Sequence, residues 1–159
     1  MAAVTLEAAI DPGALLVVDT SAILAYLDGK ERVSGAAALV FDRLIATGRN
    51  SAVISAVSVT EVLVRPLRAG STSATGTVDA FLRSFPNLFV EPATYEIARE
   101  AARIRAATGL RTPDALILAT SAVVGSPILV ANDDRWVGAV ERVGLADRLV
   151  QLDTFSGKA

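Results

Sequence analysis

The chain of 159 residues contains neither cysteine nor histidine. The absence of cysteine excludes disulfides, thiolate metal sites and cysteine nucleophiles, and it fits the reducing cytoplasm, where we expect the protein to act. The absence of histidine removes the usual general base, the Ser-His-Asp triad and any zinc site built on imidazole. If the protein is an enzyme, carboxylates or a cofactor must do the chemistry, and an oxygen-bound metal ion would be Mg²⁺ or Mn²⁺.

Aromatic residues make up 5% of a sequence that is 52% hydrophobic, so the core must consist mostly of Ala, Val, Leu and Ile. No apolar run approaches the roughly 18 residues that span a membrane, so we expect no membrane partner. The first 29 residues hold no Lys or Arg and therefore lack the positive start of a signal peptide. The length favours a single domain that spans residues 1–159.

Lysine is scarce as well, because 13 of the 15 basic residues are arginines and only Lys30 and Lys158 are lysines. The net charge of −2 argues mildly against a general nucleic-acid binder. Arginine nevertheless favours bidentate contacts to phosphate or carboxylate groups. The charge pattern therefore leaves local recognition of phosphate open.

The most informative stretch is the apolar run at residues 15–18, which leads directly into Asp19, Thr20 and Ser21. A short valine-rich run predicts a buried strand. Thr20 or Ser21 is predicted to cap a helix that begins with residues 22–27. Asp19 should then lie where a central strand ends, which is where open parallel α/β sheets bind ligands. A turn or capping role is the simpler interpretation of Asp19 taken alone.

The rest of the chain alternates between short apolar segments and amphipathic ones. Further strands are predicted at residues 51–55, 88–90, 127–130 and 149–152. Helices are predicted at residues 33–47, from Ser58 to Gly70 with an interruption near Pro66, and at 78–85, 94–108, 115–124 and 133–143, with a polar loop at 71–76. This alternation predicts a three-layer α/β/α sandwich with a central, mostly parallel sheet.

Five acids lie at element ends or at the start of an apolar helix: Asp19, Glu61, Asp114, Asp133 and Asp134. The carboxyl ends of parallel strands and the helix starts that follow them share one edge of a sheet. We therefore expect Asp19, Glu61 and Asp133 at the same edge, whereas Asp114 reaches it only if the buried helix 115–124 points there.

Each acid also has a purely structural interpretation. Ser58-x-x-Glu61 fits a capping box, a first-turn Asp114 is favoured by the helix dipole, and Asp133 and Asp134 fit an ordinary turn. Taken together these interpretations are weaker, because gathered carboxylates repel one another unless a cation neutralises them. A divalent-cation site explains the set most simply.

Four segments of the sequence resemble the motifs of a known protein family. They are residues 17–24, Ile54-Ser55-x-x-Ser58-x-x-Glu61-Val62-Leu63, Pro113-Asp114-Ala115-Leu116-Ile117-Leu118-Ala119, and Ile128-Leu129-Val130-Ala131-Asn132-Asp133-Asp134-Arg135-Trp136. In order and spacing they resemble the four motifs of PIN domains, and the match covers a core of about residues 15–152. The size looks most like the VapC-type toxins of bacterial toxin–antitoxin pairs.

This resemblance implies a Mg²⁺- or Mn²⁺-dependent endoribonuclease, usually a homodimer, that is inhibited by a VapB-like antitoxin. On the resemblance, the catalytic and metal-binding acids are Asp19, Glu61, Asp114 and Asp133, around one or two ions, and Thr20 or Ser21 helps to orient water or phosphate. The arginines nearest the motifs, which either hold RNA phosphates or face solvent or antitoxin, are Arg65, Arg68, Arg111 and Arg135.

The sequence departs from the family pattern in the fourth motif. Ala131 stands where a hydroxyl residue is usual, so a side chain able to touch water or metal is missing. Asp134 makes the fourth acid ambiguous, although the spacing to Trp136 favours Asp133. Trp136 itself is expected in the core.

Three alternatives remain. A catalytically degenerate PIN domain would act as a binding or regulatory module, an idea that Ala131 keeps open. A phosphohydrolase of the haloacid dehalogenase type needs a second Asp two residues after Asp19, where this chain has Ser21. A receiver-like domain needs a late lysine in the sheet, and the only late lysine is Lys158.

Overall fold

The centre of the structure, a computed structural model that describes residues 5–157, is a five-stranded sheet. The strands are β1 (Leu16–Val18), β2 (Ala52–Ser55), β3 (Leu88–Glu91), β4 (Ile128–Ala131) and β5 (Leu149–Gln151). Their order is β3-β2-β1-β4-β5, and every neighbouring pair is parallel. The strand order reverses its direction between β1 and β4, and ligands bind at such a switch point in open α/β sheets.

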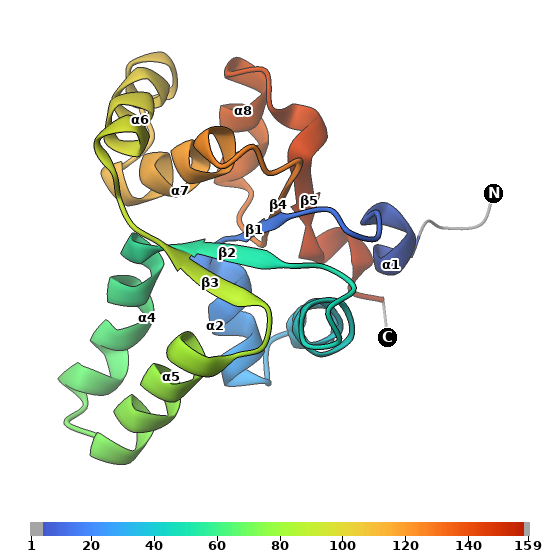
Figure 1. The fold of residues 1–159 in the computed structure, drawn as a ribbon, viewed down its shortest axis with the longest axis vertical. Coiled ribbons are helices and arrows are strands. Elements are labelled where there is room, and N and C mark those ends of the chain that lie inside the picture. Colours follow the sequence, from blue (N-terminus) through green and yellow to red (C-terminus); the bar gives the residue numbers. More distant parts are fainter. Residues whose placement is uncertain (1–4, 158–159) are drawn as a thin grey trace.

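Helices cover both faces of this sheet (Figure 1). One face carries α6 (Tyr95–Thr108), α7 (Thr112–Val123) and α8 (Arg135–Arg142). The other carries α2 (Thr20–Asp28), α3 (Ser34–Ala38), the π-helical η1 (Leu39–Ile45), α4 (Ala56–Arg68) and α5 (Thr72–Ser84). The short elements are α1 (Leu6–Ala9), η2 (Ala146–Arg148) and η3 (Leu152–Phe155). The predicted three-layer α/β/α fold is therefore confirmed, with a sheet that is parallel throughout.

The alternation of side chains along each strand builds two separate cores. In β1, Leu16 and Val18 belong to the core beneath α2, whereas Val17 belongs to the core beneath α7. In β4, Val130 likewise belongs to the core beneath α2 and Leu129 to the core beneath α7. Because successive strand residues point to opposite faces, a central strand buried on both sides needs an unbroken apolar run, as the sequence has there.

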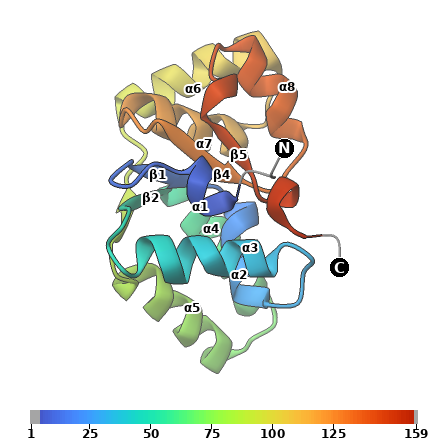
Figure 2. The same ribbon diagram turned by 90° about the vertical axis from the view of Figure 1, so that its right-hand side faces the viewer.

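The segment at residues 33–47 is helical as predicted, but it changes from the α form in α3 to the π form in η1. Figure 2 shows this helix lying alongside α2 on one face of the sheet. Its apolar side chains Val40, Phe41, Leu44 and Ile45 are fully buried in the core. Within the described residues, no helix has both the length and the apolar character needed to cross a bilayer.

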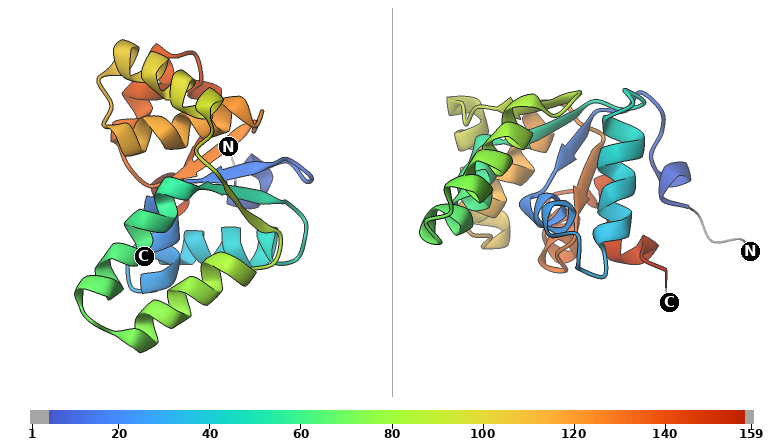
Figure 3. Two further views of the ribbon diagram at one scale, coloured as in Figure 1. Left: turned by 60° about the vertical axis from the view of Figure 1, so that its left-hand side comes forward. Right: turned by 90° about the horizontal axis from the view of Figure 1, so that it is seen from below.

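Two predictions around α4 and α5 were wrong. The helix α4 continues through Pro66 to Arg68: the proline cannot donate to Val62 O, but Ala69 N–H still bonds to Arg65 O and Ser71 N–H to Pro66 O. The expected loop at residues 71–76 is instead the start of α5, since the Ser71 hydroxyl accepts a hydrogen bond from Ala74 N–H and caps the helix. The two helices pack side by side as a hairpin (Figure 3).

Candidate active site

Asp19 lies at the switch point of the sheet, directly after β1, and its backbone N–H donates to Val130 O of β4 over 2.8 Å. The prediction that Thr20 or Ser21 caps α2 was wrong. Asp19 itself is the cap, because its Oδ2 accepts a hydrogen bond from Ser21 N–H over 3.2 Å. The turn from strand to helix therefore presents this carboxylate at the carboxyl edge of the sheet.

Asp19 is a buried residue, only 4% exposed. Its Oδ2 also accepts from the Ser21 hydroxyl and, over 3.2 Å, from Trp136 Nε1. The Ser21 hydroxyl in turn accepts from Asn132 N–H over 2.9 Å, which ties the start of α2 to the end of β4. Burial raises the pKa of Asp19 and the nearby Asp114 charge adds to this, although the hydrogen bonds from Ser21 and Trp136 oppose the rise.

Glu61 reaches the same place from α4 through a hydrogen bond to Thr20. The Thr20 hydroxyl donates to Glu61 Oε2 over 2.5 Å and shares a second hydrogen bond of 2.9 Å with the buried Ser58 hydroxyl. The capping box Ser58-x-x-Glu61 is therefore absent. Ser55 caps α4, and Glu61 lies in the second turn rather than the first.

Asp114 lies in the first turn of α7, and its residue is only 9% exposed. The buried helix does point at the sheet edge, so that Asp114 lines the same pocket as Asp19. Arg111 holds the cap position of this helix, and Thr112 is the first helical residue. The Arg111 side chain donates from Nε to Asp114 Oδ2 over 3.1 Å.

Asp133 follows β4 and is held in place by the side chains of Gln151 and Arg135. The Gln151 side chain accepts from Asp133 N–H over 3.2 Å and donates to its carbonyl over 2.7 Å. Arg135 Nε donates to both carboxylate oxygens, at 3.0 and 2.9 Å, and this hydrogen bonding lowers the pKa of Asp133 while it raises the pKa of Arg135. Asp134 is exposed and makes no side-chain cap, so the geometry favours Asp133 as the fourth acid.

A pocket of about 220 Å³ joins these groups. Its lining residues are Asp19, Thr20, Ser21, Leu24, Glu61, Arg111, Asp114, Asp133 and Arg135. Eight of the ten candidate residues predicted from the sequence are therefore brought together, whereas Arg65 and Arg68 do not line the pocket.

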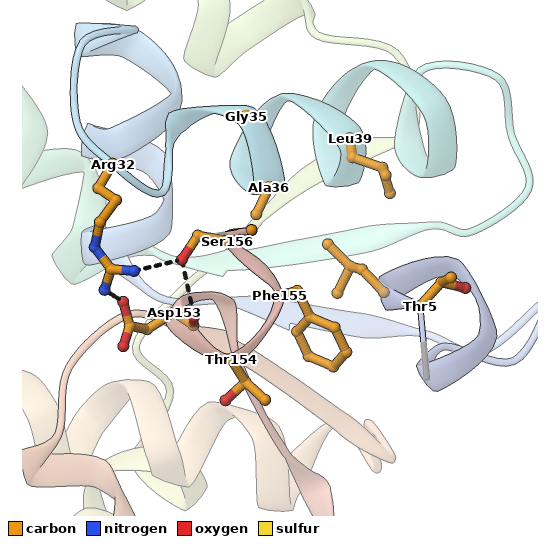
Figure 4. A pocket seen from close by; sticks show the side chains of 11 residues that line it. Thr5, Arg32, Gly35, Ala36, Leu39, Asp153, Thr154, Phe155 and Ser156 are labelled. Atoms are coloured by element: carbon orange, nitrogen blue, oxygen red, sulfur yellow. Dashed lines mark hydrogen bonds and ion pairs between the residues drawn. The ribbon is translucent and has the colours of Figure 1, made fainter. Parts of the chain in front are cut away.

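A larger cavity, of about 730 Å³, lies between α1, α3 and η3 and shares no residue with the acidic pocket. Figure 4 shows that its two charged side chains, Arg32 and Asp153, form an ion pair, and Arg32 also donates to Ser156 Oγ over 3.0 Å. Among the described residues, the two charged side chains that line this cavity neutralise each other, whereas the smaller pocket holds four acids against two arginines.

The acidic pocket fits a hard divalent cation by the chemistry of its donors. Four carboxylates and two hydroxyls supply only oxygen, which suits Mg²⁺ or Mn²⁺. In the conformation seen here, however, no three acids among residues 5–157 stand together as metal ligands. Arg135 lies among them, with Nη1 3.7 Å from Asp114 Oδ2 and Nη2 2.5 Å from Asp133 Oδ2.

Sequence reasoning missed three supporting residues. Trp136 is buried in the core as expected, yet its indole N–H also bonds to Asp19. Ser58 supports Thr20, and Gln151 holds the backbone of Asp133. A lone polar residue in the apolar strand that ends the sheet was the signal available for Gln151, whereas Ser58 and Trp136 are recognisable only from the packed structure.

Comparison with known proteins identifies a family and similar folds. The PIN domain family model matches residues 16–141. The fold is similar to VapC20 of Mycobacterium tuberculosis, a sarcin–ricin loop cleaving toxin, with 19% identity, a TM-score of 0.64 and coverage of 77% of this chain and 94% of that one.

Two complexes are also similar. A toxin–antitoxin complex from Klebsiella pneumoniae matches with 18% identity, a TM-score of 0.59 and coverage of 86% of this chain and 97% of that one. VapBC2 from Rickettsia felis, bound to a DNA fragment from its promoter, matches with 13% identity, a TM-score of 0.64 and coverage of 86% and 98%. At these identities the likeness concerns the fold alone. No functionally curated protein matches the chain significantly.

Proposed function

Because the chain belongs to the PIN domain family, we propose that it is a metal-dependent endoribonuclease that acts in the cytoplasm as the toxin of a VapBC-type pair. The observation that carries the proposal is the convergence of Asp19, Glu61, Asp114 and Asp133 from four separate elements into one pocket at the switch point. A structural role for each acid alone does not explain why they meet.

The four acids would hold one or two divalent cations. A bound Mg²⁺ or Mn²⁺ would supply positive charge to the scissile phosphate and lower the pKa of the attacking water. Thr20 orients Glu61, while Ser21 and Trp136 hold Asp19 through hydrogen bonds to a single oxygen, Oδ2. Since the chain has no histidine, the proton of the attacking water would pass to a carboxylate of the pocket, or to solvent once a bound cation has lowered the pKa of that water.

Two arginines at the pocket complete the proposed site. Arg111 and Arg135 have half-exposed to exposed side chains that now pair with Asp114 and Asp133. Guanidinium groups bind phosphate through two parallel hydrogen bonds, so these residues are suited to an RNA backbone. The net negative charge of the chain then implies a modest affinity for RNA. The enzyme would select its RNA target by the shape of the RNA and by its exposed loops.

Cleavage of a mixed RNA pool tests this function. We expect cleavage that depends on Mg²⁺ or Mn²⁺ and is lost in Asp19→Asn and Asp114→Asn, because asparagine keeps the shape and removes the charge. Asp134→Asn is the matched control, since this neighbouring acid is exposed and does not line the pocket. Equal activity in all three variants would refute a catalytic acidic site.

The alternative is a degenerate PIN domain that binds without cleaving. The buried Ala131, which lacks the hydroxyl usual at this place in the family, favours this alternative. In that case Asp19→Asn and Asp114→Asn would fold unchanged, wild type would bind no divalent cation, and partner binding would persist in both variants.

A VapB-like antitoxin is the proposed partner. A groove of about 370 Å³ between α2, α4 and α5 is lined by Leu24, Leu27, Val62, Pro66 and Val78, among others, and Leu24 also lines the acidic pocket. An apolar antitoxin segment seated there would reach the pocket from its side. Co-expression with the antitoxin should give a complex that Leu27→Asp weakens, whereas a complex unaffected by this change would place the partner elsewhere.

We also propose a homodimer. On the α4–α5 hairpin, Leu67 is 60% exposed and Val64 is partly exposed. Light scattering coupled to size-exclusion chromatography should show a dimer that Leu67→Glu dissociates. Tyr95→Lys is the control, since Tyr95 is exposed on α6; dissociation by this change alone would move the interface to that side.

A further inference from the structure

Arg135 lies across the acidic pocket as an internal cation. Its Nη2 donates to Asp133 Oδ2 over 2.5 Å, and its Nη1 lies 3.7 Å from Asp114 Oδ2. One guanidinium group therefore links the acid that follows β4 to the acid that begins α7. These are two of the four acids proposed to hold the divalent cation.

The contacts of Arg135 compete with a metal ion for the same carboxylate oxygens. Asp133 Oδ2 receives two N–H groups of the guanidinium, and Oδ1 receives Arg135 Nε and the Arg135 backbone N–H. Both oxygens are thus engaged, and among residues 5–157 no three acids are arranged as metal ligands. A cation can bind Asp133 fully only after the guanidinium group has withdrawn.

The side chain of Arg135 can withdraw while its backbone stays in place. The side chain is 55% exposed, and ion pairs in contact with solvent are weak. Arg135 is the first residue of α8, and the next residue, Trp136, is anchored by burial and by its bond to Asp19. Rotation about side-chain bonds alone can therefore release Asp133.

We infer that Arg135 is exchanged for the divalent cation and moves to the RNA phosphate, an inference that rests on the proposed metal site. Withdrawn from the acids, the guanidinium group remains at the mouth of the pocket, where a phosphate bound to the cation would accept its hydrogen bonds. Metal binding frees the arginine for phosphate, and phosphate binding draws the arginine from the acids. Because such coupling is reciprocal, each ligand strengthens the binding of the other.

The test measures binding instead of cleavage. Mn²⁺ is titrated into metal-free protein by calorimetry, with the fluorescence of Trp136, the only tryptophan, as a second signal from the site. Arg135→Gln should bind Mn²⁺ roughly two- to fivefold more tightly than wild type, as expected for the loss of an exposed competing ion pair. Arg99→Gln, an exposed arginine of α6 outside the pocket, changes the net charge equally and should bind like wild type.

A phosphate probe tests the second half of the exchange. Adenosine 5′-monophosphate, which has no diester bond to cleave, should tighten Mn²⁺ binding in wild type and in Arg99→Gln, and less so in Arg135→Gln. The opposite effects of Arg135→Gln on metal and on phosphate distinguish the exchange from a general loss of structure, which would weaken both.

The possible outcomes distinguish a failure of the proposed exchange of Arg135 from a failure of the proposed metal site. If wild type binds Mn²⁺ and Arg135→Gln binds it equally or more weakly, the inference is overturned while the metal site stands. If adenosine monophosphate tightens Mn²⁺ binding equally in both, transfer to phosphate is overturned. If neither protein binds Mn²⁺, the proposed metal site fails and the inference fails with it.

Discussion

The indole N–H of Trp136 donates a hydrogen bond of 3.2 Å to Asp19 Oδ2, across 117 positions of the sequence. Trp136 is 2% exposed and belongs to the core between the sheet and α7, so this side chain packs the core and holds the buried acid at once. The core on this face of the sheet therefore extends directly into the proposed active site.

Trp136→Phe should separate these two roles. Phenylalanine retains most of the apolar packing but cannot donate to the carboxylate, and a hydrogen bond to a charged group is worth about 1.5–3 kcal/mol. We expect the free energy of unfolding at pH 7, measured by urea titration with circular dichroism, to fall by about that amount. The pKa of Asp19 should rise further, since a bond to its ionised form is lost.

The pH dependence of this effect is its control. Once Asp19 is protonated, the indole no longer bonds to a charge, so the difference between wild type and Trp136→Phe should shrink as the pH falls below the pKa of Asp19. A difference that stays constant with pH would mean that the variant loses packing alone.

Asp19→Asn is expected to stabilise the metal-free protein at neutral pH. Burial raises the pKa of Asp19 above its ordinary value of 3.8, so the folded state binds more protons than the unfolded state between these two values. The free energy of unfolding therefore falls as the pH rises through this window, and the loss is fully present above it. Asparagine removes the charge and with it this loss.

Thermal unfolding in EDTA from pH 3 to 8 measures this prediction. The stabilities of wild type and Asp19→Asn should converge at the acid end of this range and separate above it. One unit of pKa corresponds to about 1.4 kcal/mol in the free energy of unfolding, so the difference between the two proteins reports the size of the pKa shift. Mn²⁺ should then stabilise wild type but not the variant, because a ligand stabilises only the state that binds it. A variant less stable than wild type at pH 7 in EDTA would show that the carboxylate is needed for folding.

Thr20→Val should weaken metal binding through Glu61. The Thr20 hydroxyl holds Glu61 Oε2 at 2.5 Å, and loss of such a supporting hydrogen bond typically costs about 10- to 100-fold in metal affinity. Calorimetry with Mn²⁺ measures the change. Ser58→Ala removes the second partner of Thr20 but leaves the bond to Glu61, so its effect should be smaller; equal effects would assign the loss to packing of α4 instead.

The sequence predicted that Asp19, Glu61 and Asp133 share one edge because that prediction needs only strands that run parallel, whereas the place of Asp114 was left open because it depends on the direction of α7. Asp19 and Asp133 follow strands that form the switch point, and α7 is apolar enough to be buried with Asp114 at its start. Strand ends in a parallel sheet share one edge whatever the details of packing, so the gathering of the first three acids followed from topology.

Caps and charge pairs were less predictable because they depend on single torsion angles and on distant partners. Ser55 and Ser58 are both good caps, and only the end of β2 decides that Ser55 takes the role. The segment at residues 71–76 has the composition of a loop, yet packing against α4 and a cap at Ser71 make it helical. The position of Arg135 among the acids could not be read from the sequence, since an arginine after two aspartates fits a solvated turn equally well.

Asn50 provides a prediction away from the site. Its residue is 1% exposed, and Nδ2 donates to the carbonyls of Asp11 and Ala14 over 2.9 and 2.8 Å, which fastens the segment before β1 to the turn before β2. Asn50→Ala removes this donor from both carbonyls, but Asp11 is exposed and its carbonyl still accepts from Ala14 N–H. We therefore expect the free energy of unfolding to fall by about 1–3 kcal/mol, the cost of one unsatisfied buried group.

The matched variant for this position is Asn50→Asp, which has the same shape but offers only acceptors to the two carbonyls. It should be at least as unstable as Asn50→Ala at pH 7, and it should recover partly at acid pH, where the carboxyl can donate one hydrogen bond. Both variants, studied where they are fully folded, should bind Mn²⁺ like wild type, because Asn50 does not line the acidic pocket. If Asn50→Asp were as stable as wild type at pH 7, the two carbonyls would not depend on this donor, and the segment before β1 would be held by apolar packing instead.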